Sequence, residues 1–327
     1  MRLIALEEHF TTPAFLDGPG KGFREAMLRA GGERAAATFA RLADIGDGRV
    51  AAMDEAGVEM QMLSLNYPGT EQAEGEEAIA VSRDANDLLA AALRRHPKRF
   101  AGFASLPTGA PEIAADELTR CVRELGFKGA NINGHNRGRY LDDPFYAPVL
   151  ARAEALNVPI YLHPTLPPPA VMQASYSGFH PATTFMIAGP GWGWHIETGM
   201  HVLRMVLAGV FDRFPKLQMV VGHLGEALPF MMPRMEASAA MLPPGAGPKR
   251  PLGDYMRENL HYTFGGFNYA PTFADLIANV GAARIMFSVD YPYGSMTEAR
   301  EFLEGLPNSD ADRAAIAHGN AERLLGV

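Results

Sequence analysis

The sequence predicts an α/β protein built as a single (β/α)8 barrel that spans residues 1–327. Short apolar runs bounded by turn residues alternate with helical patterns along the whole chain. Eight such units in a chain of 327 residues fit a closed barrel better than an open doubly wound sheet. No change in composition marks a boundary to a second domain, so we expect one.

Eight runs are predicted to be strands because each is short, largely apolar and flanked by turn residues. In chain order they are Arg2–Leu6, Glu59–Leu65, Phe100–Leu106, Gly129–Asn133, Pro159–His163, Leu217–His223, Leu260–Phe264 and Arg284–Asp290. Strands that recur with a helix between them pair in parallel. Their carboxyl ends should therefore meet at one face of the barrel, where barrel enzymes place their active sites.

The segments between these strands carry the apolar spacing of amphipathic helices. They are Arg49–Ala56, Glu76–His96, Pro111–Leu125, Pro144–Leu156, Glu197–Phe214, Glu226–Met241, Thr272–Val280 and Asp310–Leu325. Leu242–Pro251 contains four prolines and is predicted to be a loop.

Two connections are longer than usual, residues 10–48 after the first strand and residues 164–196 after the fifth. The second is rich in proline, glycine and aromatic residues, including Trp192 and Trp194. Both leave the carboxyl ends of strands, so we expect them to cover a substrate. Simple elaboration of the surface is the alternative.

Composition excludes several classes of protein. The chain has 29 Lys and Arg against 37 Asp and Glu, a formal charge of -8, and no basic run that could bind nucleic acid. Apolar stretches such as Met205–Phe211 are far shorter than the roughly 20 residues of a membrane helix. The N-terminus lacks the pattern of a signal peptide, so we expect a cytoplasmic protein without a membrane partner. With Cys121 as its single cysteine, the chain must bind any metal through His, Asp or Glu.

Four predicted strand ends carry side chains that can bind a metal. The first leads into Glu7-Glu8-His9, and the others end at His163, His223 and Asp290. Since residues two apart in a strand point the same way, Glu7 and His9 should both face inward while Glu8 faces away. Mixed nitrogen and oxygen donors suit Zn²⁺ or Mn²⁺, and a larger share of oxygen favours Mn²⁺.

The other histidines are weaker candidates, because a lone histidine is usually an ordinary hydrogen-bonded residue. We expect structural or surface roles for those away from the mouth: His96, His180, His201, His261 and His318. His135 and His195 lie on mouth-side loops, and their roles stay open.

Several motifs together resemble a known family. They are Ala5-Leu6-Glu7-Glu8-His9-Phe10, Gly222-His223-x-Gly225-Glu226, Ser288-x-Asp290-x-Pro292 and Gly319-Asn320-Ala321-Glu322-Arg323-Leu324. They are similar to the amidohydrolase superfamily and, within it, to the metal-dependent nonoxidative decarboxylases of hydroxybenzoates, such as γ-resorcylate and 2,3-dihydroxybenzoate decarboxylases. The similarity covers nearly the whole chain. One departure is Thr263-Phe264-Gly265-Gly266-Phe267, where those enzymes tend to have a Thr-Thr-Ser-Gly-type turn.

The resemblance implies a set of roles. One divalent ion would be bound by Glu7, His9, His163 and Asp290, with His223 and Glu226 as a polar pair beside the substrate. By the same analogy Asp290 is expected to protonate the ring carbon, and His223 to polarise the substrate or relay a proton. The resemblance also implies a homodimer or a higher homo-oligomer.

The expected substrate is a small aromatic carboxylic acid, most simply an ortho-hydroxylated benzoate. A flat ring needs apolar walls and a few polar contacts. We expect Phe23, Tyr67, Trp192 and Tyr293 to form the wall and Arg234 to anchor a carboxylate or hydroxyl group.

Two other functions stay open. In a mononuclear hydrolase or hydratase acting on a lactone or an unsaturated acid, the metal would activate water and Asp290 would be the base. A two-metal hydrolase is disfavoured, because Lys128 would lie about 16 Å along the strand from Asn133, at the wrong end of the barrel. The remaining alternative is a catalytically idle binding protein on a barrel scaffold.

Overall fold

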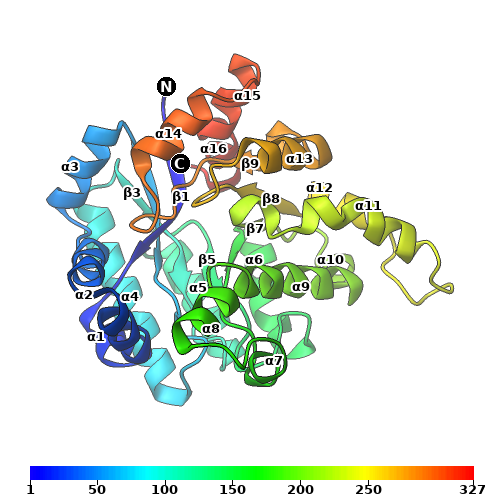
Figure 1. Ribbon diagram of the computed structural model, residues 1–327, viewed down its shortest axis with the longest axis horizontal. Coiled ribbons are helices and arrows are strands. Elements are labelled where there is room, and N and C mark those ends of the chain that lie inside the picture. The colour runs from blue at the N-terminus through cyan, green and yellow to red at the C-terminus, as the bar shows by residue number, and fades with distance from the viewer.

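The computed structural model describes residues Met1–Val327 and shows parallel strands surrounded by helices (Figure 1). The strands are β1 (Ile4–Phe10), β2 (Met60–Leu65), β3 (Phe100–Gly102), β4 (Ala104–Ser105), β5 (Ala130–Asn133), β6 (Ile160–His163), β7 (Met219–Val221), β8 (Leu260–Thr263) and β9 (Ile285–Met286). They form two parallel sheets, ordered β1-β2-β3 and β4-β5-β6-β7-β8-β9.

The two sheets meet at two places. β3 and β4 are the halves of one predicted strand, interrupted at Phe103, whose amide donates to the carbonyl oxygen of Leu63 at 2.9 Å. On the other side, Leu6 forms a parallel bridge with Ser288, and its amide donates to the carbonyl oxygen of Phe287 at 3.0 Å. The strands therefore succeed one another in chain order, and the predicted class, an α/β barrel with parallel strands, is confirmed.

Helices and short helical turns connect the strands. The α-helices are α1 (Pro13–Asp17), α2 (Lys21–Ala43), α3 (Asp47–Ala56), α4 (Gly75–Arg95), α5 (Pro111–Arg123), α6 (Ala147–Leu156), α7 (Pro169–Ser175), α8 (Pro181–Ala188), α9 (Gly193–Leu207), α10 (Val210–Arg213), α11 (Leu228–Ala239), α12 (Leu252–Glu258), α13 (Ala270–Val280), α14 (Met296–Glu304), α15 (Asp310–Ala314) and α16 (Asn320–Leu325). The shorter turns are η1 (Pro144–Tyr146), η2 (His223–Gly225), η3 (Ala282–Arg284) and η4 (Ala315–Gly319). No helix combines the length and the apolar character needed to cross a membrane.

Burial on both faces explains why most strand residues are apolar. A cluster of 60 buried apolar residues lies mainly between strands and helices. A second cluster of 11 contains strand residues such as Ile4, Met62 and Val220, together with Ala321 and Leu325 of α16. The C-terminal helix therefore packs against the strand ends opposite those that carry the candidate site.

The two long connections are largely helical, which the sequence analysis did not predict. Residues 10–48 contain α1 and α2, and residues 164–196 contain α7 and α8 (Figure 1). α2 buries only Ala35, Phe39 and Leu42 and kinks at Gly32, so it lacks the apolar stripe that reveals a helix in a sequence. The short helices α12 and α14 were also missed.

Candidate metal centre and active site

A bulge in β1 positions the first two candidate ligands. The pairing of β1 with β2 is irregular between Ala5 and Glu8, and Glu7 has a φ of 68°. Glu7 Oε2 accepts a hydrogen bond from Thr263 Oγ1 at 3.1 Å, and His9 Nε2 lies 3.2 Å from Asp290 Oδ1. Glu7 and His9 thus both face the site, as predicted, although the strand does not alternate regularly between them.

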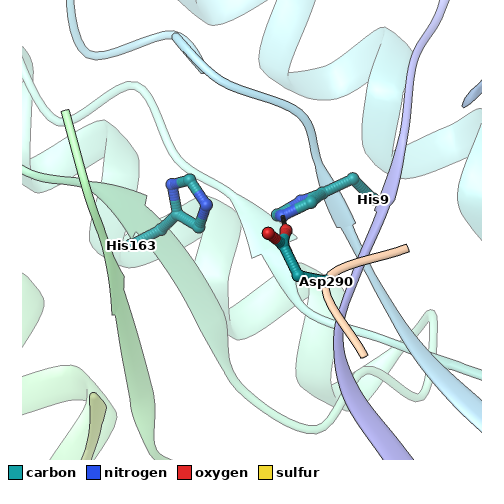
Figure 2. Close-up of side chains that lie close together, drawn as sticks. All are labelled: His9, His163 and Asp290. Carbon is teal, nitrogen blue, oxygen red and sulfur yellow. Dashed lines mark ion pairs between the residues drawn. The ribbon is translucent and has the colours of Figure 1, made fainter. Parts of the chain in front are cut away.

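His9, His163 and Asp290 converge on one point from three parts of the chain (Figure 2). Their nearest donor atoms all lie within 4.8 Å of one another. His163 Nδ1 is 2.9 Å from the carbonyl oxygen of Pro164, and His9 Nδ1 is 3.3 Å from Ser64 Oγ. Such contacts to one ring nitrogen orient a histidine and leave the other nitrogen available as a ligand.

Glu7 completes a donor set that fits a divalent metal. Its Oε1 atom is buried and accepts no hydrogen bond, and its nearest cationic partner is the ring of His223, whose Nε2 lies 3.6 Å away, so this oxygen is free to bind a metal ion. Burial, reinforced by the nearby ring of His9, holds the pKa of His163 well below its usual value, so His163 is in the neutral form that binds metals. Two imidazoles and two carboxylates suit Zn²⁺ or Mn²⁺.

Glu8 has a supporting position that the sequence analysis missed. It faces away from the metal-binding cluster and is fully buried, and its carboxylate accepts hydrogen bonds from the amides of Val289 at 2.9 Å and Tyr291 at 3.3 Å. These two amides flank Asp290. They bond to a side chain instead of a neighbouring strand, which explains why the predicted strand Arg284–Asp290 is only Ile285–Met286.

Strained backbone is concentrated at this site. Glu7, His223, Leu224, Glu226, Ala227 and Asp290 are six of the eight non-glycine residues with positive φ. Each such residue costs on the order of 1–3 kcal/mol and persists only where the surrounding structure enforces it. Their clustering around the candidate ligands is independent evidence that the site is functional.

A carboxylate shared by two histidines lies beside the metal-binding cluster. Glu226 Oε1 is 2.7 Å from His223 Nδ1, and Glu226 Oε2 is 2.7 Å from His195 Nδ1. Burial alone would lower the pKa of His223, but the carboxylates of Glu7 and Glu226 raise it to about 10. Burial would likewise raise the pKa of Glu226, yet the two histidines hold it below its usual value. The role of His195, open from the sequence, is therefore linked to His223.

A cavity of about 170 Å³ opens above these groups. It is lined by Phe23, Met27, Asn66, Tyr67, His163, Phe185, Pro190, Trp194, His223, Asp290 and Tyr293. The ring of Tyr67 lies between those of Phe23 and Trp194, with centroids 5.1 and 5.7 Å away. Tyr293 donates a hydrogen bond to Asn66 Oδ1 at 2.9 Å. Phe23, Tyr67 and Tyr293 thus lie where the sequence analysis placed a substrate wall, and Trp194, Asn66 and Phe185 were missed.

Two expected wall residues lie elsewhere. Trp192 is 55% exposed and lines a separate groove of about 470 Å³. The chain turns tightly before α9, where a side chain at Gly193 would come within 2.3 Å of the carbonyl oxygen of Ala188, and Trp194 instead of Trp192 reaches the cavity. Arg234 is exposed on α11 and is not among the residues that line either space, and its expected role as an anchor stays a prediction.

We expect Gly222→Ala to disrupt the centre through one added methyl group. A Cβ atom there would lie 2.5 Å from Glu7 Oε1, so the carboxylate would have to move. The φ of -74° at Gly222 suits alanine, which leaves the steric clash as the cause. We expect reduced metal content and a loss of about 1–3 kcal/mol in unfolding free energy, measured by elemental analysis and denaturant titration.

Gly22→Ala is the matched control, because a Cβ at Gly22 in α2 would have no neighbour within 4 Å. It should keep its metal, and its unfolding free energy should stay the same or increase slightly. A Gly222→Ala protein with a full equivalent of metal and unchanged stability would contradict the prediction.

Comparisons with known proteins find relatives that match over nearly the whole chain. A gamma-resorcylate decarboxylase from Polaromonas sp. is 40% identical over 336 residues, covering 98% of this chain and 98% of that protein. The structure of 2,6-dihydroxybenzoate decarboxylase complexed with 2,6-dihydroxybenzoate matches with a TM-score of 0.91 and 38% identity over 100% of both chains. A dihydroxybenzoic acid decarboxylase from Polaromonas sp., with bound manganese and the inhibitor 2-nitroresorcinol, matches with a TM-score of 0.90 and 39% identity over 99% of this chain and 97% of that one.

A parallel barrel in which His9, His163 and Asp290 converge at the mouth is typical of metal-dependent barrel enzymes. The protein belongs to the amidohydrolase family, whose model matches residues 9–327. The relatives described above are decarboxylases that match over nearly the whole chain, and the protein is an enzyme of the carboxy-lyase class. The resemblance drawn from the motifs is thereby confirmed.

Proposed function

We propose that this enzyme removes CO₂ without oxidation from a benzoate that carries a hydroxyl group ortho to its carboxylate. The observation that carries the proposal is the common location of Asp290, His163 and His223 in a small cavity with aromatic walls. Relatives that act on dihydroxybenzoates support this choice of substrate. The ring would pack against the aromatic walls with its carboxylate toward Asp290.

Glu7, His9, His163 and Asp290 would hold one divalent ion, Zn²⁺ or Mn²⁺. Such an ion would supply Lewis-acid chemistry to the carboxylate of a substrate beside these residues. The side chains of Phe23, Tyr67 and Trp194 exclude water and fix the plane of the ring.

Proton delivery is assigned to Asp290. When the bond between the ring and the carboxylate breaks, its electron pair stays on the ring carbon, which then needs a proton. Asp290 lines the cavity, and its Oδ2 atom lies 4.0 Å from His223 Nε2. His223, oriented by Glu226, stabilises negative charge on the reacting group from the other side.

The test is a screen of purified, metal-replete protein against hydroxybenzoates and unsaturated dicarboxylates, with CO₂ and ring products measured together. We expect CO₂ and the matching phenol from at least one ortho-hydroxylated benzoate. Hydrated or hydrolysed products without CO₂ would overturn the proposal in favour of a hydratase or hydrolase. Absence of bound metal together with absence of turnover would favour a binding protein.

Replacing Tyr67 by alanine should change the preference among substituted benzoates. Its ring lies between Phe23 and Trp194, so its loss would widen the cavity where ring substituents would lie. We expect bulkier substrates to gain in relative kcat/KM, measured over a panel of benzoates. Tyr67→Phe keeps the ring face and should keep the ranking. An unchanged ranking in Tyr67→Ala with only lower stability would show that Tyr67 serves packing.

We further propose that the protein acts in the cytoplasm as a homodimer, each chain folding as one domain. Exposed apolar side chains surround the groove of about 470 Å³, with Trp192 at 55%, Tyr269 at 59% and Phe230 at 73% exposure. Contiguous apolar surface of this kind is typical of subunit interfaces. Sedimentation should show a dimer at micromolar concentration, and a monomer there would refute the proposal.

A further inference from the structure

His195 receives a hydrogen bond that determines where its ring carries a proton. The indole Nε1 of Trp194 donates to His195 Nε2 at 3.0 Å. An indole N–H can only donate, so this contact requires an unprotonated Nε2. The carbonyl oxygen of Pro190 also lies 3.0 Å from Nε2, and it could accept a hydrogen bond from Nε2 only if the indole contact were lost. While the indole of Trp194 donates this hydrogen bond, the single ring proton of His195 is on Nδ1.

That proton points to Glu226. His195 Nδ1–H donates to Glu226 Oε2 at 2.7 Å, and His223 Nδ1–H donates to Glu226 Oε1 at the same distance. Both carboxylate oxygens are thus engaged, and Glu226 is only 2% exposed, so water does not compete for them. The rings of His195 and His223 lie 4.7 Å apart at 66°, on two sides of one carboxylate.

The same chain of contacts reaches the cavity wall. Trp194 lines the cavity, and its ring centroid is 5.7 Å from that of Tyr67. His195 does not line the cavity but lies behind it, along the groove beside Trp192. The polar contacts therefore form one continuous chain from Trp194 through His195 and Glu226 to His223, whose Nε2 faces Glu7 and Asp290.

We propose that Trp194 and His195 are positioning residues that act through Glu226 to hold the His223 ring in its productive orientation. The inference rests on the proposed decarboxylation. A carboxylate held by a single histidine can rotate, whereas one held on both oxygens cannot do so without breaking a short buried hydrogen bond. A wall residue thereby helps to align a polar group at the reacting end of the substrate.

Four variants of the metal-replete enzyme test this positioning role of Trp194 and His195, which we call the relay. His195→Leu removes the donor to Glu226, whereas His195→Asn keeps an N–H donor close to the position of Nδ1. We expect His195→Leu to lower kcat by about 10–100-fold with little change in KM, as is typical when a supporting hydrogen bond is lost. His195→Asn should recover most of the rate. His195→Leu combined with Glu226→Gln should lose no more than Glu226→Gln alone, because both act through one carboxylate.

A measurement without substrate separates the relay from the proposed reaction. In protein loaded with diamagnetic zinc, the His223 Nδ1–H resonance should be sharp in the wild type and in His195→Asn. It should be shifted or broadened in His195→Leu and in Trp194→Phe. If this pattern holds but no hydroxybenzoate releases CO₂, the proposed function fails and the relay stands.

Three results would overturn the relay. One is an unaltered His223 resonance in His195→Leu. Another is an equal loss of rate in His195→Asn and His195→Leu together with lower melting temperatures, which would assign His195 to packing against Phe267, 5.1 Å away. The last is a double variant in which the losses of kcat caused by His195→Leu and by Glu226→Gln add in free energy.

Discussion

Asp290→Asn is expected to reduce turnover by several orders of magnitude while the protein stays folded. Asparagine has nearly the same shape and, like aspartate, tolerates the left-handed backbone found here at a φ of 65°. The amides of Val289 and Tyr291 would still be held by Glu8. The carboxamide cannot release and regain a proton, so protonation of the ring carbon should fail.

The measurement is kcat for CO₂ release, normalised to bound metal because Asp290 is also a proposed ligand. Turnover by the wild type in heavy water should place deuterium on the product ring. His223→Asn is the comparison variant. It should reduce turnover less than Asp290→Asn does, chiefly by weakening the binding of the substrate or the transition state. Near-normal turnover of metal-bound Asp290→Asn would mean that the proton comes from another group, with His223 the next candidate.

His163→Ala should lose most of the bound metal. The ring is buried, its Nδ1 is held by the carbonyl oxygen of Pro164, and its other nitrogen faces His9 and Asp290. Removing one of four ligands leaves an open, weakly held site. We expect far less than one equivalent of metal per chain by elemental analysis after dialysis, with a matching loss of activity.

His180→Ala is the control for this substitution. His180 is exposed at the start of α8, where its side chain accepts a hydrogen bond from Ala182 N, and it lines neither the cavity nor the groove. It should keep its metal and lose about 1 kcal/mol of stability at most as a helix cap. A full equivalent of metal in His163→Ala would remove His163 from the proposed ligand set.

The fold class and the candidate ligands could be predicted because both depend on which residues follow one another within a single strand. A buried parallel strand is a short apolar run whatever its neighbours are, and its carboxyl end is at the mouth. His163 ends β6 and Glu7 and His9 lie within β1, so their placement followed from local pattern. The resemblance of the motifs added the reaction class, which the comparisons confirm.

The helices in the long connections were not predictable in the same way. α2 is mostly exposed and kinked, and α7 buries no residue, so neither carries a clear apolar period. The direction of Trp192 and Trp194 depends on how tightly the chain turns around Gly193. Local pattern does not encode that turn, which explains why the wrong tryptophan was expected in the wall.

The sequence by itself determined the barrel class and the location of the proposed ligands Glu7, His9, His163 and Asp290 at the mouth of the barrel. Each of these is set by the position of a residue within its own element. Only the tertiary structure decided that Glu8 holds the backbone around Asp290 and that Glu226 joins His195 to His223. Those contacts join segments that are distant in the chain, and they form only when loops and strand ends pack into one buried space where polar groups must find partners.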